Sequence, residues 1–237
     1  MKILAFDSSG LPASVAVLDG NIISCEYTVN DKRTHSQTLL PMLDEIVKTL
    51  GMNLDTVDAI AVSAGPGSFT GLRIGSATVK GLAMALEKPV IPVPTLDALA
   101  YNLCGTEGLV CPIMDARRNQ VYTGIYSFDG SVMNRVMDHE AMEVSKLIKV
   151  LDGLGSRVCF LGDGVPVYAG TIDSSMKTPH YYAPAHLSRQ RAGAVAALGA
   201  VLYADGVFET ADEHVPCYLR VSQAEREREE RRAGLKK

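Results

Sequence analysis

The residues best suited to chemistry form a glycine-rich segment from Gly65 to Gly75, with the sequence GPGSFTGLRIG. Exposed N–H groups at the start of a helix can hold an anion, so a phosphate site is one interpretation of this segment, and a purely structural turn is the other. A P-loop would need a lysine that the segment lacks, and Thr70 stands where a dinucleotide fingerprint needs its third glycine. Phe69 occupies the place of the nucleophile in a serine-hydrolase elbow. The segment therefore predicts a turn before a helix and leaves an anion site open.

Histidine and cysteine do not show the spacing of a metal centre. No histidine has another at i,i+4, the spacing that places two ligands on one helix face. The cysteines are odd in number and include no C-x-x-C pair, so we expect free thiols in a reducing compartment. The residues concerned are His35, His139, His180, His186 and His214, and Cys25, Cys104, Cys111, Cys159 and Cys217. The spacing of these residues predicts no metal site.

Composition places the chain among ordinary globular proteins. It has 237 residues, of which 47% are hydrophobic and 21% are charged, enough for one large domain or two lobes at roughly 150 residues per domain. The net charge of −4 gives no broad basic field for nucleic acid. Asp7 interrupts the N-terminal apolar run too early for a signal peptide, and the weakly polar stretch 192–204 is too short to span a bilayer. We expect a cytoplasmic protein with no membrane contact.

The order of predicted elements occurs twice along the chain. In the first half we expect strands at 3–6, 13–18 and 22–29, a helix at 36–50, a strand at 57–63, a helix at 71–86, and a strand at 89–93 before a short helix. In the second half we expect a strand at 110–114, a hairpin that turns at Asp129-Gly130 as the first turns at Asp19-Gly20, a helix at 143–151 and a strand at 158–161. The repeat predicts a duplicated α/β protein with a first lobe at 1–104, a second lobe at 105–221 and a charged tail at 222–237.

Several segments together resemble one known family. The duplicated order resembles the actin-like ATPase (ASKHA, ribonuclease H-like) fold with its two lobes. ILAFDSSG at 3–10, HSQTLLPMLDEI at 35–46 and GPGSFTGLRIG at 65–75 resemble the TsaB family, also called YeaZ. The likeness continues more weakly through MDARRNQVYTGIY at 114–126 to CYLR at 217–220. It therefore covers nearly the whole chain.

The resemblance implies a function in tRNA modification. It implies a non-catalytic subunit that pairs with a TsaD-type enzyme, together with a TsaE-type ATPase, to form N6-threonylcarbamoyladenosine next to the anticodon of tRNA. The chain would then meet tRNA only through the complex. Whether it forms a homodimer when its partner is absent is left open by the sequence. The alternative is an actin-like enzyme in its own right, either an ATP-dependent kinase or carbamoyl transferase, or a glycoprotease-like peptidase.

The resemblance also implies that ligands have been lost. TsaD-like enzymes carry two metal-binding histidines where this chain has Thr95 and Leu99, and a leucine has no lone pair for a metal. Active members of the superfamily place acids and glycines after the first strand of each half, whereas Asp115 here is followed by Ala-Arg-Arg. The aspartates are then either purely structural or the remains of a nucleotide site. We expect no firmly bound cofactor, and a weak or partner-shared ATP or ADP site remains open. The vestigial candidates are Asp7, Ser8, Asp115, Gly162 and Gly164.

Two helices of the first half are predicted to form the partner interface. Apolar positions cover roughly 160° of the helix at 36–50, more than a one-sided contact needs. The helix at 71–86 is apolar or small over all but a narrow arc, so we expect it to be buried on two sides. Members of the family that this chain resembles pair through these two helices. The expected interface residues are Leu39, Leu40, Met42, Leu43, Val47, Leu72, Gly75, Ala77 and Met84.

Overall fold

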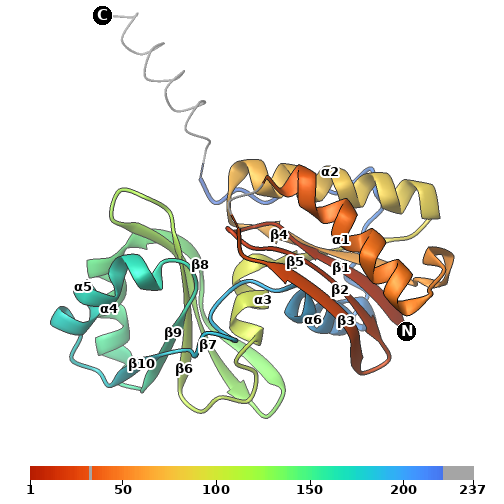
Figure 1. Cartoon of the computed structure of the whole chain (residues 1–237). Helices are drawn as coiled ribbons and strands as arrows, with labels where there is room; N and C mark the ends of the chain where they lie inside the picture. Colours follow the sequence, from red (N-terminus) through yellow and green to blue (C-terminus); the bar gives the residue numbers. More distant parts are fainter. Residues whose placement is uncertain (32–33, 221–237) are drawn as a thin grey trace, which may run out of the picture.

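The structure is a computed structural model that describes residues 1–31 and 34–220, and it shows two lobes, each built on a five-stranded sheet (Figure 1). The first sheet has the order β3-β2-β1-β4-β5, with strands β1 (Lys2–Asp7), β2 (Ala13–Asp19), β3 (Ile22–Val29), β4 (Ala59–Gly65) and β5 (Val90–Pro94). The second has the order β10-β9-β6-β7-β8, with strands β6 (Leu109–Asp115), β7 (Gln120–Asp129), β8 (Val132–Glu143), β9 (Val158–Leu161) and β10 (His180–Tyr182).

Helices pack against both faces of each sheet. They are α1 (His35–Leu50), α2 (Phe69–Leu86), α3 (Thr95–Tyr101), α4 (Val144–Leu154), α5 (Val165–Ser175) and α6 (Ala192–Ala204), with a 3₁₀ turn at Leu54–Thr56. Helices α1 and α2 pack on one face of the first sheet and α6 on the other, while α4 and α5 pack on the outer face of the second (Figure 1). Helix α3 lies between the two sheets.

The predicted duplication is confirmed. Each sheet starts with an antiparallel meander, β1-β2-β3 or β6-β7-β8, and is extended by two parallel strands. Both predicted hairpin turns contain a glycine in the left-handed region, Gly20 at φ 60° and Gly130 at φ 59°, which glycine adopts without a Cβ clash. The chain therefore has the duplicated actin-like α/β fold with two lobes.

Strand β1 shows why its sequence is apolar without alternation. Leu4 and Phe6 face α1 and α2, while Ile3 and Ala5 face α6, and all four are fully buried. Successive side chains of a strand point to opposite faces, so a strand covered by helices on both sides must be apolar throughout.

The end of the chain does not follow the expected second lobe of 105–221. After β10 the chain returns to the first lobe, where α6 packs against β1 and β2. A Cβ on Gly199 would lie 3.1 Å from the Cβ of Ala61, so small residues allow this close approach between helix and sheet. The Ala/Gly-rich composition of 192–204 thus reflects packing on the first sheet.

Residues 208–220, which we call the C-terminal strap, run along the first lobe beside α2. Glu209 exchanges both backbone hydrogen bonds with Val90, and the Cys217 N–H donates to the Ala64 carbonyl at 2.7 Å. The ring of Tyr218 stacks on Phe69 with centroids 4.1 Å apart. The charged tail predicted at 222–237 lies outside the described residues, and within the described ones no helix is long and apolar enough to cross a membrane.

Candidate functional site

The first candidate loop follows β1 and is closed by contacts within the chain. Asp7 is 1% exposed, and its Oδ1 accepts hydrogen bonds from the Ser9 N–H at 2.9 Å and the Ser9 hydroxyl at 2.7 Å. Burial raises the pKa of Asp7, although the hydrogen bonds from Ser9 oppose the shift. The Ser8 hydroxyl donates to the Gly71 carbonyl at 2.9 Å. Asp7 thus closes the loop on Ser9, and Ser8 ties the loop to the start of α2.

The second candidate loop follows β6 and is more open. Asp115 is exposed, and its Oδ1 accepts hydrogen bonds from the Arg117 N–H at 2.8 Å and the Tyr168 hydroxyl at 3.0 Å. Its own N–H donates to Asp163 Oδ1 at 3.1 Å. Burial raises the pKa of Asp163. The carboxylates of the two halves therefore lie in different environments, one buried and one in water.

The candidate glycines of the second half have a packing reason to be glycine. A Cβ on Gly162 would lie 2.2 Å from the Ile113 carbonyl oxygen, and one on Gly164 would lie 2.9 Å from the same atom. Gly162 also has a φ of 107°, which residues with a Cβ rarely adopt. Its N–H donates to the Ser188 carbonyl at 2.9 Å. These glycines pack the loop after β9 onto β6.

The glycine-rich segment after β4 uses its N–H groups within the chain. The Ser68 N–H donates to the Ser9 carbonyl at 2.7 Å, and the Ser68 hydroxyl caps α2 by accepting from the Gly71 N–H at 3.2 Å. A Cβ on Gly71 would lie 2.1 Å from the Ser8 carbonyl oxygen, and one on Gly75 would lie 2.2 Å from the Ser8 hydroxyl. Of the two interpretations of this segment, these contacts favour the structural turn.

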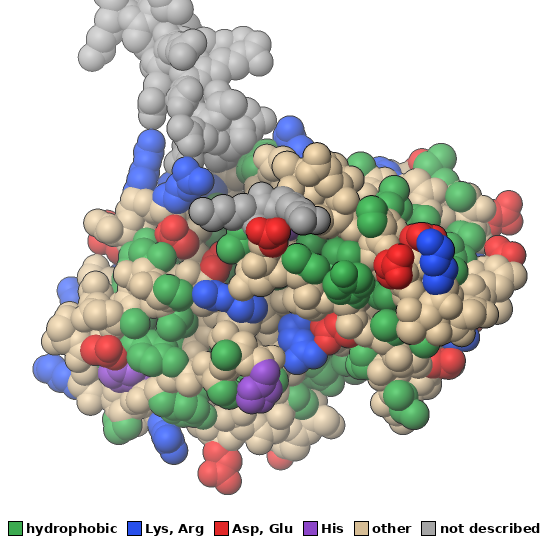
Figure 2. Space-filling model, viewed as in Figure 1, with side chains coloured by type: hydrophobic (Ala, Val, Ile, Leu, Met, Phe, Trp, Pro, Cys, Tyr) green, Lys and Arg blue, Asp and Glu red, His purple; other side chains and the backbone are tan. Residues whose placement is uncertain are grey.

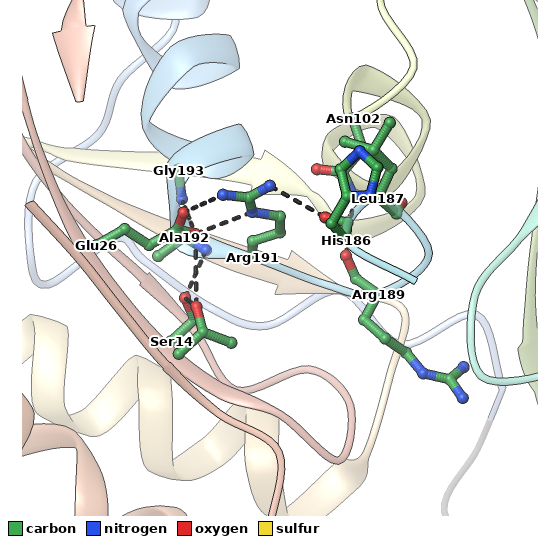
Figure 3. Close-up of polar contacts among 10 residues, drawn as sticks. Ser14, Glu26, Asn102, His186, Leu187, Arg189, Arg191, Ala192 and Gly193 are labelled. Atoms are coloured by element: carbon green, nitrogen blue, oxygen red, sulfur yellow. Dashed lines mark hydrogen bonds and ion pairs between the residues drawn. The ribbon is translucent and has the colours of Figure 1, made fainter. Parts of the chain in front are cut away.

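The segment between β10 and α6 fills the space beside the first loop. Gln190 is 2% exposed, and its amide nitrogen lies 2.7 Å from where a Cβ on Gly10 would be. Asn102 fixes the segment by donating to the carbonyls of Leu187 and Arg189 at 3.3 and 2.8 Å (Figure 3). The sequence gives no signal for the position of Gln190, because Gly10, against which it lies, is far away along the chain.

The same segment ends in a cap on α6. The Ala192 N–H donates to the Ser14 hydroxyl at 2.8 Å, and the Gly193 N–H donates to Glu26 Oε1 at 3.0 Å (Figure 3). Arg191 forms an ion pair with Glu26. Strands β2 and β3 thus satisfy two of the four free N–H groups with which a helix begins, and hold the segment with Gln190 against the first lobe.

The positions where the resemblance implied lost histidines lie in the core. Thr95 is fully buried, and its hydroxyl accepts a hydrogen bond from the Gly65 N–H at 3.1 Å. Leu99 is 1% exposed and belongs to the apolar cluster between α3 and the second sheet. Within the described residues, no three His, Cys, Asp or Glu side chains come together in a way that could hold a metal.

More than half of the expected interface residues lie inside the first lobe. These positions pack against the rest of the first lobe, so the structure corrects their assignment to a partner surface. An apolar helix here is largely buried by its own chain. The residues concerned are Leu39, Met42, Leu43, Leu72 and Gly75, the first four between 1 and 4% exposed.

The other expected residues form a partly apolar face on α1 and α2. Leu40 on α1 is 52% exposed and Met84 on α2 is 61% exposed. Ala77 on α2 is also exposed, and Val47 on α1 is half-buried. A Cβ added to Gly81 on α2 would meet nothing within 4 Å. Figure 2 shows hydrophobic side chains on this part of the first lobe, among acidic and basic ones. We call Leu40, Ala77, Gly81 and Met84 the helix face.

Two five-stranded sheets of the same order define the class: a two-lobed protein of actin-like fold. The family model described as "TsaD: tRNA N6-adenosine threonylcarbamoyltransferase" matches residues 23–226. The tRNA threonylcarbamoyladenosine biosynthesis protein TsaB of Bacillus subtilis is 33% identical over 95% of this chain and 96% of that protein. The protein of the same name from Haemophilus influenzae is 43% identical over 52% of each chain.

A solved structure agrees with the sequence matches. YeaZ from Pseudomonas aeruginosa superposes with a TM-score of 0.78 at 29% identity, covering 92% of this chain and 99% of that one. The chain belongs to the TsaB (YeaZ) family. The recognition made from the motifs at 3–10, 35–46 and 65–75 is confirmed.

Proposed function

We propose that the chain is a non-catalytic subunit that pairs with a TsaD-type enzyme in forming N6-threonylcarbamoyladenosine next to the anticodon of tRNA. The observation that carries this proposal is the helix face of a TsaB-family member, on which Leu40 and Met84 are more than half exposed. Removing apolar side chains from water is favourable, and small side chains let two helices approach closely. The same face serves a homodimer when the partner is absent, and a TsaE-type ATPase joins the assembly.

The closed first loop supports a subunit without chemistry of its own. Asp7 Oδ1 accepts hydrogen bonds from Ser9 within the loop, and the Gln190 side chain lies against Gly10. Any ATP or ADP would accordingly bind weakly or at a surface shared with the partner.

Reconstitution of the modification tests this function. The chain is mixed with TsaD-type and TsaE-type proteins, ATP and unmodified tRNA, and threonylcarbamoyladenosine is measured by mass spectrometry. We expect modification to depend on the chain, and the isolated chain to turn over no ATP. Steady ATP hydrolysis by the isolated chain would instead favour an independent actin-like enzyme.

Replacing Asp7 by asparagine is expected to leave modification largely intact. Asparagine keeps the Oδ1 that accepts from Ser9, whereas Asp7→Ala leaves a buried N–H and hydroxyl unpaired and costs about 1–3 kcal/mol of stability. Because burial raises the folded-state pKa of Asp7 above its unfolded value, its contribution to stability is present at low pH and is lost as pH rises through the raised pKa. Asp7→Asn should remove that loss, as urea titrations across pH would show. A collapse of modification in folded Asp7→Asn would restore a nucleotide role here.

The purified chain is expected to contain far less than one transition metal per molecule. Thr95 and Leu99 offer at most one neutral hydroxyl, and that oxygen already accepts from Gly65. Elemental analysis after purification without chelators checks this. Zinc or iron at one atom per chain would remove the main argument against catalysis.

A further inference from the structure

The turn between β6 and β7 is held in an unfavourable backbone conformation. Arg117, Arg118 and Asn119 have φ values of 62°, 55° and 59°, and none of them is glycine. Residues with a Cβ rarely adopt the left-handed region, and runs of such residues are rarer still. Strain of this kind persists only where surrounding contacts enforce it, and it is frequent at functional sites.

Hydrogen bonds on both sides of the turn enforce this conformation. Asp115 Oδ1 accepts from the Arg117 N–H at 2.8 Å, and the Gln120 N–H donates to the Arg117 carbonyl at 3.1 Å. The Asn119 carbonyl accepts from the Val144 N–H at 3.3 Å, which ties the turn to α4. The turn is therefore a fixed feature of the second lobe.

The strain presents two arginine side chains to solvent. Arg117 and Arg118 are exposed, and within the described residues neither guanidinium forms a hydrogen bond or an ion pair. A third arginine joins them, since Arg220 at the end of the strap donates to the Ala116 carbonyl at 3.2 Å. Figure 2 shows Lys and Arg side chains near one another at the upper edge of the second lobe. This basic cluster stands on a chain whose net charge is −4.

We propose that the turn at Arg117 and Arg118 contacts the phosphate backbone of tRNA when the chain sits in the complex proposed above. The inference rests on that proposed function. A guanidinium matches the geometry of a phosphate group and can bond it through two N–H groups. The exposed surface beside the arginines is polar at Asn119, whereas the core of a protein interface is apolar and aromatic. The neighbouring Asp115 carboxylate is anionic, and its Oδ1 is turned to the Arg117 N–H and the Tyr168 hydroxyl. Two free arginines are too few to hold RNA alone, so the contact adds to binding by the partner.

The test is the affinity of the assembled complex for unmodified tRNA over a salt series. Arg117→Ala/Arg118→Ala removes two charges from the turn, and Lys146→Ala/Lys149→Ala removes the same charge from exposed positions of α4 in the same lobe. Each phosphate contact contributes about 0.7 to 0.9 to the slope of log affinity against log salt. We expect the arginine variant to bind tRNA roughly 10-fold more weakly at low salt, with a slope shallower by about 1 to 2, and the lysine variant to match the wild type.

Two further variants separate charge from backbone geometry. Arg117→Lys/Arg118→Lys keeps the charge and should retain most of the salt slope. Arg118→Gly relieves the strain at one position and removes one guanidinium, so it should raise or preserve the melting temperature while weakening tRNA binding. Equal tRNA affinity and slope for wild type and the double alanine variant, in complexes of equal stoichiometry, would overturn the proposal. Failure of the wild-type chain to bind the partner appears before any RNA is added, and it would refute the proposed function and this contact with it.

Discussion

Replacing Met84 by arginine is expected to weaken binding to a TsaD-type partner by roughly 10- to 100-fold while the free chain stays folded. Met84 is 61% exposed in the last turn of α2, where a cation is compatible with the helix dipole. In an interface the added charge would be buried without a counter-ion, and the expected loss corresponds to about 1.4 to 2.8 kcal/mol. Titration calorimetry with the partner measures it, and circular dichroism reports the fold.

A matched variant guards against a general effect of charge. Val201 is 46% exposed in the last turn of α6, on the opposite face of the first sheet, so Val201→Arg should bind the partner as the wild type does. Ala77→Glu should behave like Met84→Arg. Met42→Arg should instead unfold the chain, since Met42 is 4% exposed in the core. Unchanged affinity for folded Met84→Arg and Ala77→Glu would refute the helix face as the interface.

Replacing Asp97 by alanine is expected to destabilise the chain by about 3–5 kcal/mol. Asp97 lies on α3 with 6% exposure. Its Oδ1 accepts from the Tyr126 hydroxyl and His139 Nε2, both at 2.7 Å, and its Oδ2 pairs with Arg135 at 2.6 Å. These partners lie on β7 and β8, so the network joins α3 to the second sheet. At a few degrees per kcal/mol for a chain of this size, the melting temperature should fall by roughly 10 °C or more.

The pH dependence of unfolding tests whether the ionised carboxylate of Asp97 stabilises the fold. Burial opposes the charge of Asp97, but hydrogen bonds from His139 and Tyr126 and the charge of Arg135 outweigh it and hold the pKa of Asp97 below its usual value. A depressed folded-state pKa contributes stability above the unfolded pKa, and this contribution is lost as pH falls through the folded value. Asp97→Asn keeps the shape and should lose less stability than Asp97→Ala, without that acid-dependent loss. Alanine and wild-type chains of equal stability at neutral pH would contradict this account.

The repeat and its elements could be read from the sequence because the signals are local. Alternating apolar residues, Asp-Gly turns and strand-to-helix glycines depend on neighbours along the chain, and the predicted helices at 36–50 and 71–86 match α1 and α2 within two residues at each end. Strand β4 begins two residues later than predicted, at Ala59. Boundaries shift because the last turn or strand residue depends on tertiary contacts.

The candidate site could be predicted only in part because burial depends on the whole fold. An apolar arc on α1 does not reveal which residues face the sheet, so Leu40 and Leu39 look alike in sequence although one is 52% and the other 1% exposed. The contacts of Gln190 with Gly10 and of Asp97 with Arg135 join segments far apart in the chain. The left-handed turn at Arg117, Arg118 and Asn119 could not be predicted either, because residues with a Cβ rarely adopt that conformation.

The measurement that tests the central claim most directly is co-purification of the untagged chain with a tagged TsaD-type protein, followed by light scattering to determine stoichiometry. The account predicts a stable complex of defined stoichiometry for the wild type and for Val201→Arg, and its loss for Met84→Arg. Absence of a complex with the wild-type chain, together with ATP turnover by the chain alone, would contradict it.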